Sequence, residues 1–261
     1  MTNASPLTLP AARAEEFRTV FSVSVAHFVS HYYVLLLPPL FAFVRSDYGV
    51  SYTELGLALA AFNVVSAAFQ TPAGFMVDRL GARTILIGGL LLGACSFAVV
   101  AAVSSFWVLV AMFAVAGLGN TVYHPADYAI LSDHISADRI GRAFSVHTFA
   151  GMLGSAVAPA SLLFLQDFVG WRGAFLVAAA LGLVAAALIA MQRDDARPHG
   201  LSQVRQWGSD RASWQLLLSP AILRNFAFFT LLAVIGGGIQ NYSVVALAAL
   251  HGTPLPLANA A

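Results

Sequence analysis

The sequence lacks lysine altogether, has a single cysteine and contains few charges of either sign. All 13 basic residues are arginine, and only 10% of the residues are charged. Cys95 lies inside an apolar run, so no disulfide framework can form and no redox compartment is indicated. The net charge of +1 points to no nucleic-acid partner. Residues 1–18 contain no apolar h-region, which argues against a cleavable signal peptide.

Long apolar runs take up most of the chain. Hydrophobic residues make up 59% of it, and the mean hydropathy is +0.79. A membrane-spanning helix needs roughly 20 apolar residues, and only helices and closed barrels satisfy their backbone groups in lipid. We therefore expect an all-α membrane protein with the lipid bilayer as its surroundings. Seven spanning helices are predicted, at 19–44, 54–77, 84–103, 107–131, 141–165, 174–191 and 225–250.

The arginines between these spans predict the orientation. With the N-terminus inside, 11 of the 13 arginines lie on the cytoplasmic side, and only Arg45 and Arg172 lie outside. Because basic residues favour the cytoplasmic side, we expect a cytoplasmic N-terminus in a bacterial inner membrane.

The pattern divides the chain into four segments. We expect a cytoplasmic tail at 1–18, a six-helix bundle at 19–191, a cytoplasmic linker with an interfacial helix at 192–224, and helix 7 with a truncated C-terminus at 225–261.

A short charged connection joins the second and third spans. It has the pattern G-x-x-x-D-R-x-G-x-R, formed by Gly74, Asp78, Arg79, Gly81 and Arg83. This pattern resembles the signature loop between helices 2 and 3 of the major facilitator superfamily. The resemblance implies the six-helix N-terminal bundle of that fold plus a seventh helix. Because the family joins two six-helix halves, it also implies that five helices are missing and that a C-terminal half or a second subunit is required. It also implies secondary transport of a small molecule by alternating access, with these five residues as a conformational latch.

Polar residues inside the spans indicate which helices line a pathway, because polar groups at membrane depth must face protein or a cavity. His27, Gln70, His124 and His147 each lie roughly 9–12 Å from the cytoplasmic end of their helix. They are therefore expected in one layer. The predicted cavity residues are His27, Asn63, Gln70, Asn120, His147, Gln240 and Asn241.

The fourth span contains the run G-x-G-N-x-x-x-H-P, which ends at Pro125. Proline removes a backbone donor and clashes with the carbonyl four residues earlier, so a kink is expected. His124 and Asp127 are three residues apart and share a helix face. We predict proton coupling at His31, His124 and Asp127. The run resembles the fosmidomycin-resistance-type exporters of the superfamily, although Phe113 stands where many proton-coupled members have arginine.

The fifth span has small residues at close spacing, including Gly151 and Gly154, and ends its motif at Pro159. Small residues let a neighbouring helix approach closely, so we predict tight packing here and a bend at Pro159. The run resembles the antiporter motif G-x-x-x-G-P of drug exporters, with Ala158 in the second glycine position. This likeness favours export over import.

Three other functions were weighed. The chain has neither a G-x-S-x-G elbow nor an H-E-x-x-H pair, so an enzyme is not expected. No cofactor or resident metal is predicted. A divalent-metal transporter using His27 and His31, which share a helix face, is one alternative. A non-transporting scaffold, or a half-transporter that needs a partner, is the other.

Overall fold

The computed structural model describes residues 9–192 and 218–260. Within these ranges the chain is helical and has no strand, which confirms the predicted all-α class. The chain forms two compact units, Met1–Ala196 and Arg197–Ala261. Each unit is described by itself below.

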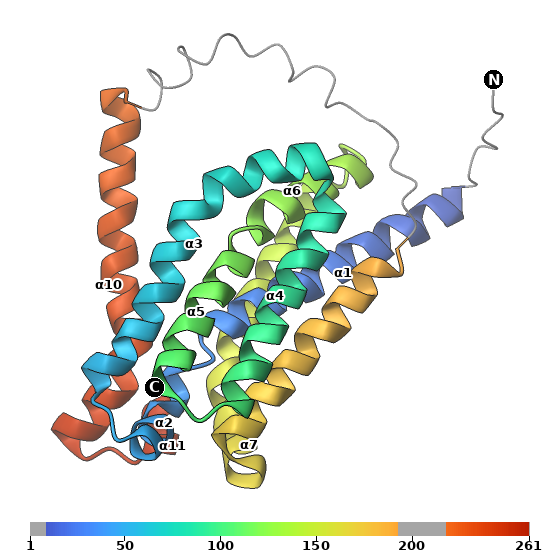
Figure 1. Cartoon of the computed structure of the whole chain (residues 1–261). Helices are drawn as coiled ribbons and strands as arrows, with labels where there is room; N and C mark the ends of the chain where they lie inside the picture. The colour runs from blue at the N-terminus through green and yellow to red at the C-terminus, as the bar shows by residue number, and fades with distance from the viewer. Residues whose placement is uncertain (1–8, 193–217, 261) are drawn as a thin grey trace. The chain divides into compact units, whose positions relative to one another are not determined.

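The first unit is a helical bundle (Figure 1). Its elements are α1 (Leu9–Val34), the 3₁₀ turn η1 (Pro38–Leu40), α2 (Phe41–Tyr48), α3 (Tyr52–Leu80), α4 (Ala82–Ala102), α5 (Phe106–Asn120), α6 (Tyr123–His134) and α7 (Ile140–Ala190).

The long helix α7 contains two of the predicted spans. Its backbone departs from helical geometry at Gly170, with φ 71° and ψ 170°, a conformation that strongly favours glycine. The turn divides α7 into two arms, which correspond to the spans predicted at 141–165 and 174–191. In the described residues six helical segments are long and apolar enough to cross a membrane, and the division of α7 brings the number of crossings to seven. The first arm is continuous helix through Pro159, where the sequence predicted a bend.

The first span differs from its prediction at both ends. The helix begins at Leu9 rather than residue 19, so part of the predicted tail is helical. Alanine, arginine and glutamate dominate these turns, and all three favour helix. At the other end Pro38 and Pro39 interrupt the helix, because each lacks a backbone N–H. The chain resumes in α2, which ends at Gly49 in the left-handed conformation.

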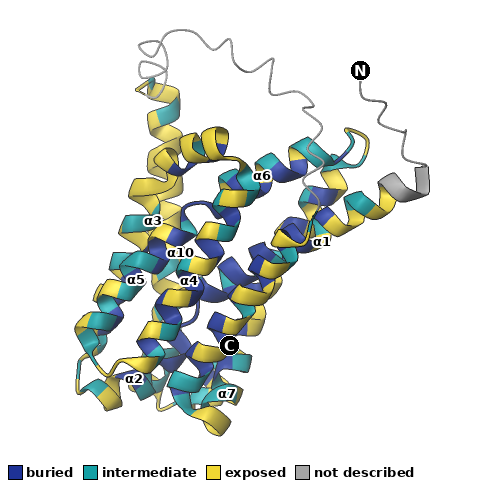
Figure 2. Cartoon of the chain, turned by 45° about the vertical axis from the view of Figure 1, so that its right-hand side comes forward, coloured by how far each residue is buried: buried dark blue, intermediate teal, exposed yellow. Residues whose placement is uncertain are grey.

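Close helix packing holds the bundle together. α1 packs along α7, α4 packs on α7 and α5, and α3 packs on α5. Glycines lie at these contacts: a Cβ at Gly117 would lie 2.3 Å from the Phe62 carbonyl oxygen, and one at Gly154 would lie 2.3 Å from that of Phe28. Small residues permit this approach and the van der Waals contact that associates helices in lipid. Buried residues lie where the helices face one another, and exposed apolar residues cover the outside (Figure 2).

Ionic contacts tie the ends of the helices. Arg139, just before α7, donates to Glu16 of α1 through Nε (2.7 Å) and Nη2 (2.9 Å). The hydrogen bond to Glu16 raises the pKa of Arg139 above its ordinary value. At the opposite end, Asp47 accepts from Arg172 Nη2 at 2.9 Å and from Trp171 Nε1 at 3.2 Å. These contacts join α1 to the start of α7 at one end of the bundle and α2 to the second arm of α7 at the other.

The second unit contains α10 (Pro220–His251) and α11 (Leu255–Ala260). Ser219 is the N-cap residue of α10 and Pro220 its first residue, a position where the missing N–H of proline costs nothing. Gly252 ends the helix in the left-handed conformation. The predicted interfacial helix in the linker falls mostly on residues outside the described ranges.

Candidate functional site

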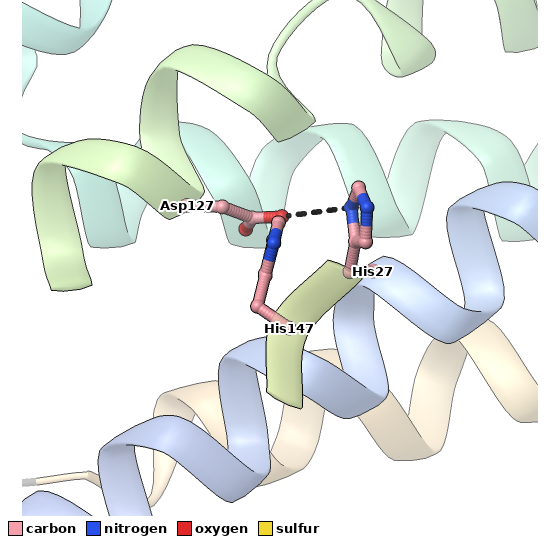
Figure 3. Close-up of side chains that lie close together, drawn as sticks. All are labelled: His27, Asp127 and His147. Carbon is pink, nitrogen blue, oxygen red and sulfur yellow. Dashed lines mark hydrogen bonds and ion pairs between the residues drawn. The ribbon is translucent and has the colours of Figure 1, made fainter. Parts of the chain in front are cut away.

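Three polar side chains from three helices converge inside the first unit (Figure 3). Asp127 of α6 is 0% exposed, His147 of α7 1% and His27 of α1 4%. The Oδ2 atom of Asp127 lies 3.0 Å from His147 Nε2 and 3.3 Å from His27 Nδ1. The two imidazole rings stack with centroids 3.8 Å apart and planes at 22°. A carboxylate is thus buried at membrane depth with imidazoles as its partners.

The break in the fourth span positions Asp127. α5 ends at Asn120 and α6 begins at Tyr123, so the interruption lies at Thr121 and Val122. Pro125 supplies no backbone N–H to the carbonyl of Thr121 and crowds it, which explains the break at this place. The Thr121 hydroxyl instead donates to the Leu118 carbonyl at 2.7 Å. The break starts a new helix whose buried face carries Asp127.

Gly151 makes room for the histidines of α1. A Cβ at this position would lie 2.6 Å from Cδ2 of His27 and 2.9 Å from Cδ2 of His31. No side chain larger than hydrogen fits without moving the two rings. Gly151 and Gly154 therefore serve as contact points where α1 lies against α7, in keeping with the small-residue spacing of the sequence.

Two further histidines border the three converging groups. The His27 ring centroid lies 4.7 Å from that of His31 and 5.3 Å from that of His124. His31 Nδ1 lies 3.1 Å from the Ser155 hydroxyl, and His124 is exposed. We call His27, His31, His124, Asp127 and His147 the histidine–aspartate cluster. The contacts to Asp127 come from His27 and His147 rather than from His124, which the sequence spacing had paired with Asp127.

Several buried polar atoms in the cluster have no hydrogen-bond partner among the described residues. They are His27 Nδ1, Asp127 Oδ1, His147 Nδ1 and the nearby Tyr123 hydroxyl. Buried polar groups are normally paired, so each such atom calls for an explanation. All four can accept a hydrogen bond from a bound water, and the two histidine nitrogens and the carboxylate oxygen can also bind a proton or a cation. The arrangement can therefore hold a positive species next to a buried carboxylate.

The cluster also meets a geometric requirement for a metal ion. One ligand atom from each of His27, Asp127 and His147 lies within 4.8 Å of the others. This set differs from the His27 and His31 pair considered from sequence, because Asp127 and His147 come from other helices.

The remaining predicted cavity residues are more scattered. Asn120 donates to the Ser66 hydroxyl at 3.0 Å and so links α5 to α3. Asn63 is exposed and donates to the Leu59 carbonyl of its own helix, and Gln70 is exposed. Gln240 and Asn241 lie on α10, in the second unit, where Asn241 donates to the Gly237 carbonyl. Their placement with the cavity stays a prediction.

The residues of the predicted latch lie mostly in helix. α3 runs through Gly74, Asp78 and Arg79, and only Gly81, with φ 87°, separates it from α4. A Cβ at Gly74 would meet nothing within 4 Å among the described residues. Arg83 reaches the end of α7 and donates to the Ile189 and Ala190 carbonyls at 3.2 and 2.5 Å. Asp78 and Arg79 are exposed.

Sequence reasoning missed three neighbours of these groups. Ser155 contacts His31, Ser66 contacts Asn120, and the Tyr128 ring lies 5.8 Å from those of His124 and His147. Serine is common in membrane helices, so its type gave no signal. For Tyr128 a signal existed: it lies four residues after His124 and shares its helix face.

Comparisons with known proteins agree with this architecture. The family model described as Major Facilitator Superfamily matches residues 23–258. The chain belongs to the Major Facilitator Superfamily. A crystal structure of a bacterial homologue of the human lysosomal transporter Spinster, inward-facing and unoccupied, superposes with a TM-score of 0.76 and 15% identity. The superposition covers 97% of this chain and 59% of the other chain. At 15% identity it is evidence for the fold alone.

Curated relatives match part of the chain. The "Probable L-galactonate transporter" of Escherichia coli is 29% identical over 140 residues, covering 54% of this chain and 31% of the relative. The "Multidrug resistance protein B homolog" of Mycobacterium tuberculosis is 27% identical over 177 residues, covering 68% and 32%. A "Probable sulfoacetate transporter" of Cupriavidus necator is 30% identical over 141 residues, covering 54% and 33%. The matches thus span about a third of each relative. The family consists of transporters, which confirms the prediction that the chain is not an enzyme.

Proposed function

We propose that this superfamily member works as a secondary transporter that exports a small organic molecule by alternating access, driven by protons. In this proposal the chain supplies the N-terminal bundle, and a C-terminal half or second subunit completes the pathway. The proposal places the protein in the bacterial inner membrane with its N-terminus in the cytoplasm. The bundle fold and the transporter relatives support this class of function.

The histidine–aspartate cluster is the observation that carries the proposal. A buried carboxylate is costly in a low-dielectric interior unless a positive charge or hydrogen bonds accompany it. Asp127 is fully buried and has two imidazole partners, with two more imidazoles in ring contact with His27. A proton taken up from one side would neutralise the carboxylate or charge a histidine. Its release would restore the first state, which gives the cluster two charge states that can favour two conformations.

The connection between α3 and α4 supports a rocking motion. Arg83 ties the start of α4 to the last carbonyls of α7, so the cytoplasmic ends of these helices move together. Asp78 and Arg79 remain exposed beside this tie and are available to a second half of the transporter. We propose that they hold the two halves in one state and release them in the other.

Export is favoured by two features of sequence. The run ending at Pro125 resembles the fosmidomycin-resistance-type branch, and the small-residue run of α7 resembles the antiporter motif of drug exporters. Multidrug-resistance proteins occur among the relatives, beside transporters named for L-galactonate and sulfoacetate. The substrate is therefore proposed only as a small organic molecule.

The experiment uses everted membrane vesicles from cells that produce the chain together with the C-terminal half or second subunit that the proposal requires, and the vesicles carry an imposed pH gradient. A pH-sensitive dye reports collapse of the gradient when L-galactonate, sulfoacetate or ethidium is added. We expect one of these compounds to collapse the gradient with the wild-type chain. Asp127→Asn should abolish compound-dependent proton movement, because it removes the buried charge while preserving side-chain shape.

Asp133→Asn is the matched control, since Asp133 lies on the same helix α6 outside the cluster. It should behave as wild type. Proton movement that survives in Asp127→Asn would refute the coupling site. Absence of any compound-dependent movement in the wild type across a wider panel would instead favour the scaffold function.

A further inference from the structure

Three side chains of the histidine–aspartate cluster have the ligand chemistry of a transition-metal site. His27, Asp127 and His147 come from α1, α6 and α7, and one ligand atom of each lies within 4.8 Å of the others. The Oδ2 atom of Asp127 is 3.3 Å from His27 Nδ1 and 3.0 Å from His147 Nε2. In a tetrahedral zinc site with metal–ligand bonds of about 2.1 Å, neighbouring ligand atoms are about 3.4 Å apart. We propose that His27, Asp127 and His147 bind a Zn²⁺ ion.

A second observation points to a ligand at the same place. His27 Nδ1 and Asp127 Oδ1 are buried and have no hydrogen-bond partner among the described residues. No aligned hydrogen bond therefore fixes the His27 ring. The lone pair of an imidazole nitrogen lies in the ring plane, so the stacked rings of His27 and His147 cannot both aim at one ion as they lie. The proposal therefore requires the His27 ring to rotate when the ion binds, so that Nδ1 faces the metal and the stack is broken.

The ligand types select the metal. Two imidazole nitrogens and one carboxylate suit Zn²⁺ and related transition metals, whereas Mg²⁺ and Ca²⁺ require mainly oxygen ligands. Three protein ligands leave a fourth position for water or for another cluster histidine. His31 and His124 already lie in ring contact with His27. Because two of the three ligands are imidazoles, Ca²⁺ and Mg²⁺ should not replace Zn²⁺.

A bound ion would join three helices. Asp127 belongs to the helix that follows the break at Thr121, and His27 and His147 belong to the closely packed pair α1 and α7. Zn²⁺ at this point would hold α6 against that pair and raise the unfolding temperature. The site rests on the positions of ligand atoms, not on the proposed transport function, so either can fail without the other.

The first experiment measures binding to the purified chain in detergent, with an affinity tag that contains no histidine. Co²⁺, a spectroscopic substitute for Zn²⁺, should produce the intense visible absorption of a four-coordinate site, with one ion per chain, and Zn²⁺ should displace it. Ca²⁺ and Mg²⁺ should leave the spectrum unchanged. His147→Gln and His27→Gln should each weaken Zn²⁺ binding by at least about 10- to 100-fold, the loss typical even of residues that only support a ligand.

The matched control is His134→Gln. His134 lies on α6 outside the cluster and contacts the Ile130 carbonyl through Nδ1 at 2.9 Å. This variant should bind Zn²⁺ as the wild type does. If it loses as much affinity as His147→Gln, or if Co²⁺ gives only the weak spectrum of an octahedral hydrated ion, the proposed site is wrong.

Folding is checked separately, because a cluster substitution can unfold the bundle. Thermal unfolding without metal identifies such variants, and the near-isosteric Asp127→Asn is the substitution least prone to this effect. X-ray absorption of the wild-type zinc complex needs no variant. It should show two imidazoles and oxygen ligands near 2.0–2.2 Å. A first shell that lacks two imidazoles would overturn the proposal.

Discussion

At the scale of single residues, glycines decide how closely the helices approach. The contact between α1 and α7 depends on Gly151 and Gly154, where a methyl group would meet His27, His31 or the backbone of Phe28. Gly182 likewise makes room for Tyr33, whose hydroxyl lies beside it and donates to the Ala178 carbonyl. These positions use the absence of a side chain, rather than backbone flexibility, because they lie in regular helix.

Gly154→Ala tests this directly. The added Cβ would lie 2.3 Å from the Phe28 carbonyl oxygen, and two helix backbones must move apart to relieve the contact. Overpacking of this kind costs about 1–3 kcal/mol, so the unfolding temperature in detergent should fall. Gly88→Ala is the control, because a Cβ there meets nothing within 4 Å and alanine favours helix. Equal effects of the two substitutions would contradict the packing role.

At the scale of elements, interruptions in the helices place the functional groups. Pro38 and Pro39 separate α1 from α2, and Gly170 divides α7 into two arms. The break before α6 has the clearest consequence. It redirects the chain so that Asp127 is buried against α1 and α7, while His124, one turn earlier, stays exposed.

Pro125→Ala separates stability from positioning. Alanine restores a backbone N–H for the Thr121 carbonyl, so α5 and α6 should join into one helix and the unfolding temperature should not fall. The new helix direction should move Asp127 away from His27 and His147. Zn²⁺ affinity and compound-dependent proton movement should therefore drop by about 10-fold or more.

Pro159→Ala is the comparison, because Pro159 lies in helix that is already continuous and remote from Asp127 in sequence. It should leave the affinity for Zn²⁺ and the proton movement unchanged. A Pro125→Ala chain that retains both properties would show that the break is not needed to position the carboxylate.

At the scale of the whole molecule, the orientation in the membrane is a prediction from arginine distribution. Arg142 and Asp167 are both exposed and lie near opposite ends of the first arm of α7. They are 25 positions apart, which corresponds to about 38 Å of helix, enough to place them on opposite sides of a bilayer. Their accessibility in intact cells reports the orientation.

In a Cys95→Ala background, a cysteine at Asp167 should react with a membrane-impermeant maleimide in intact cells. A cysteine at Arg142 should react only after the cells are opened. This result follows if the N-terminus is cytoplasmic. The reverse pattern of labelling would invert the proposed topology, and with it the direction assigned to the substrate.

The sequence by itself determined the membrane class, the number of spans and the family. These depend on apolar runs and short motifs, which are local along the chain and follow from the lipid solvent. It also indicated the residue types of the site, since each histidine and the aspartate was conspicuous within an apolar helix. The sequence predicted the ends of the helices less accurately. Pro38, Pro39 and Gly170 each interrupt the helix at one position, and the average composition of a span does not reveal such a position.

Only the tertiary structure decided which of these side chains meet. His27, Asp127 and His147 are separated by 100 and 20 residues, and their contact depends on how α1, α6 and α7 cross. Sequence spacing paired His124 with Asp127 because three residues make nearly one helical turn. The break at Thr121 and the close approach at Gly151 instead directed Asp127 inward, toward imidazoles of two other helices. Such pairing is set by helix crossing and packing, which no local pattern specifies.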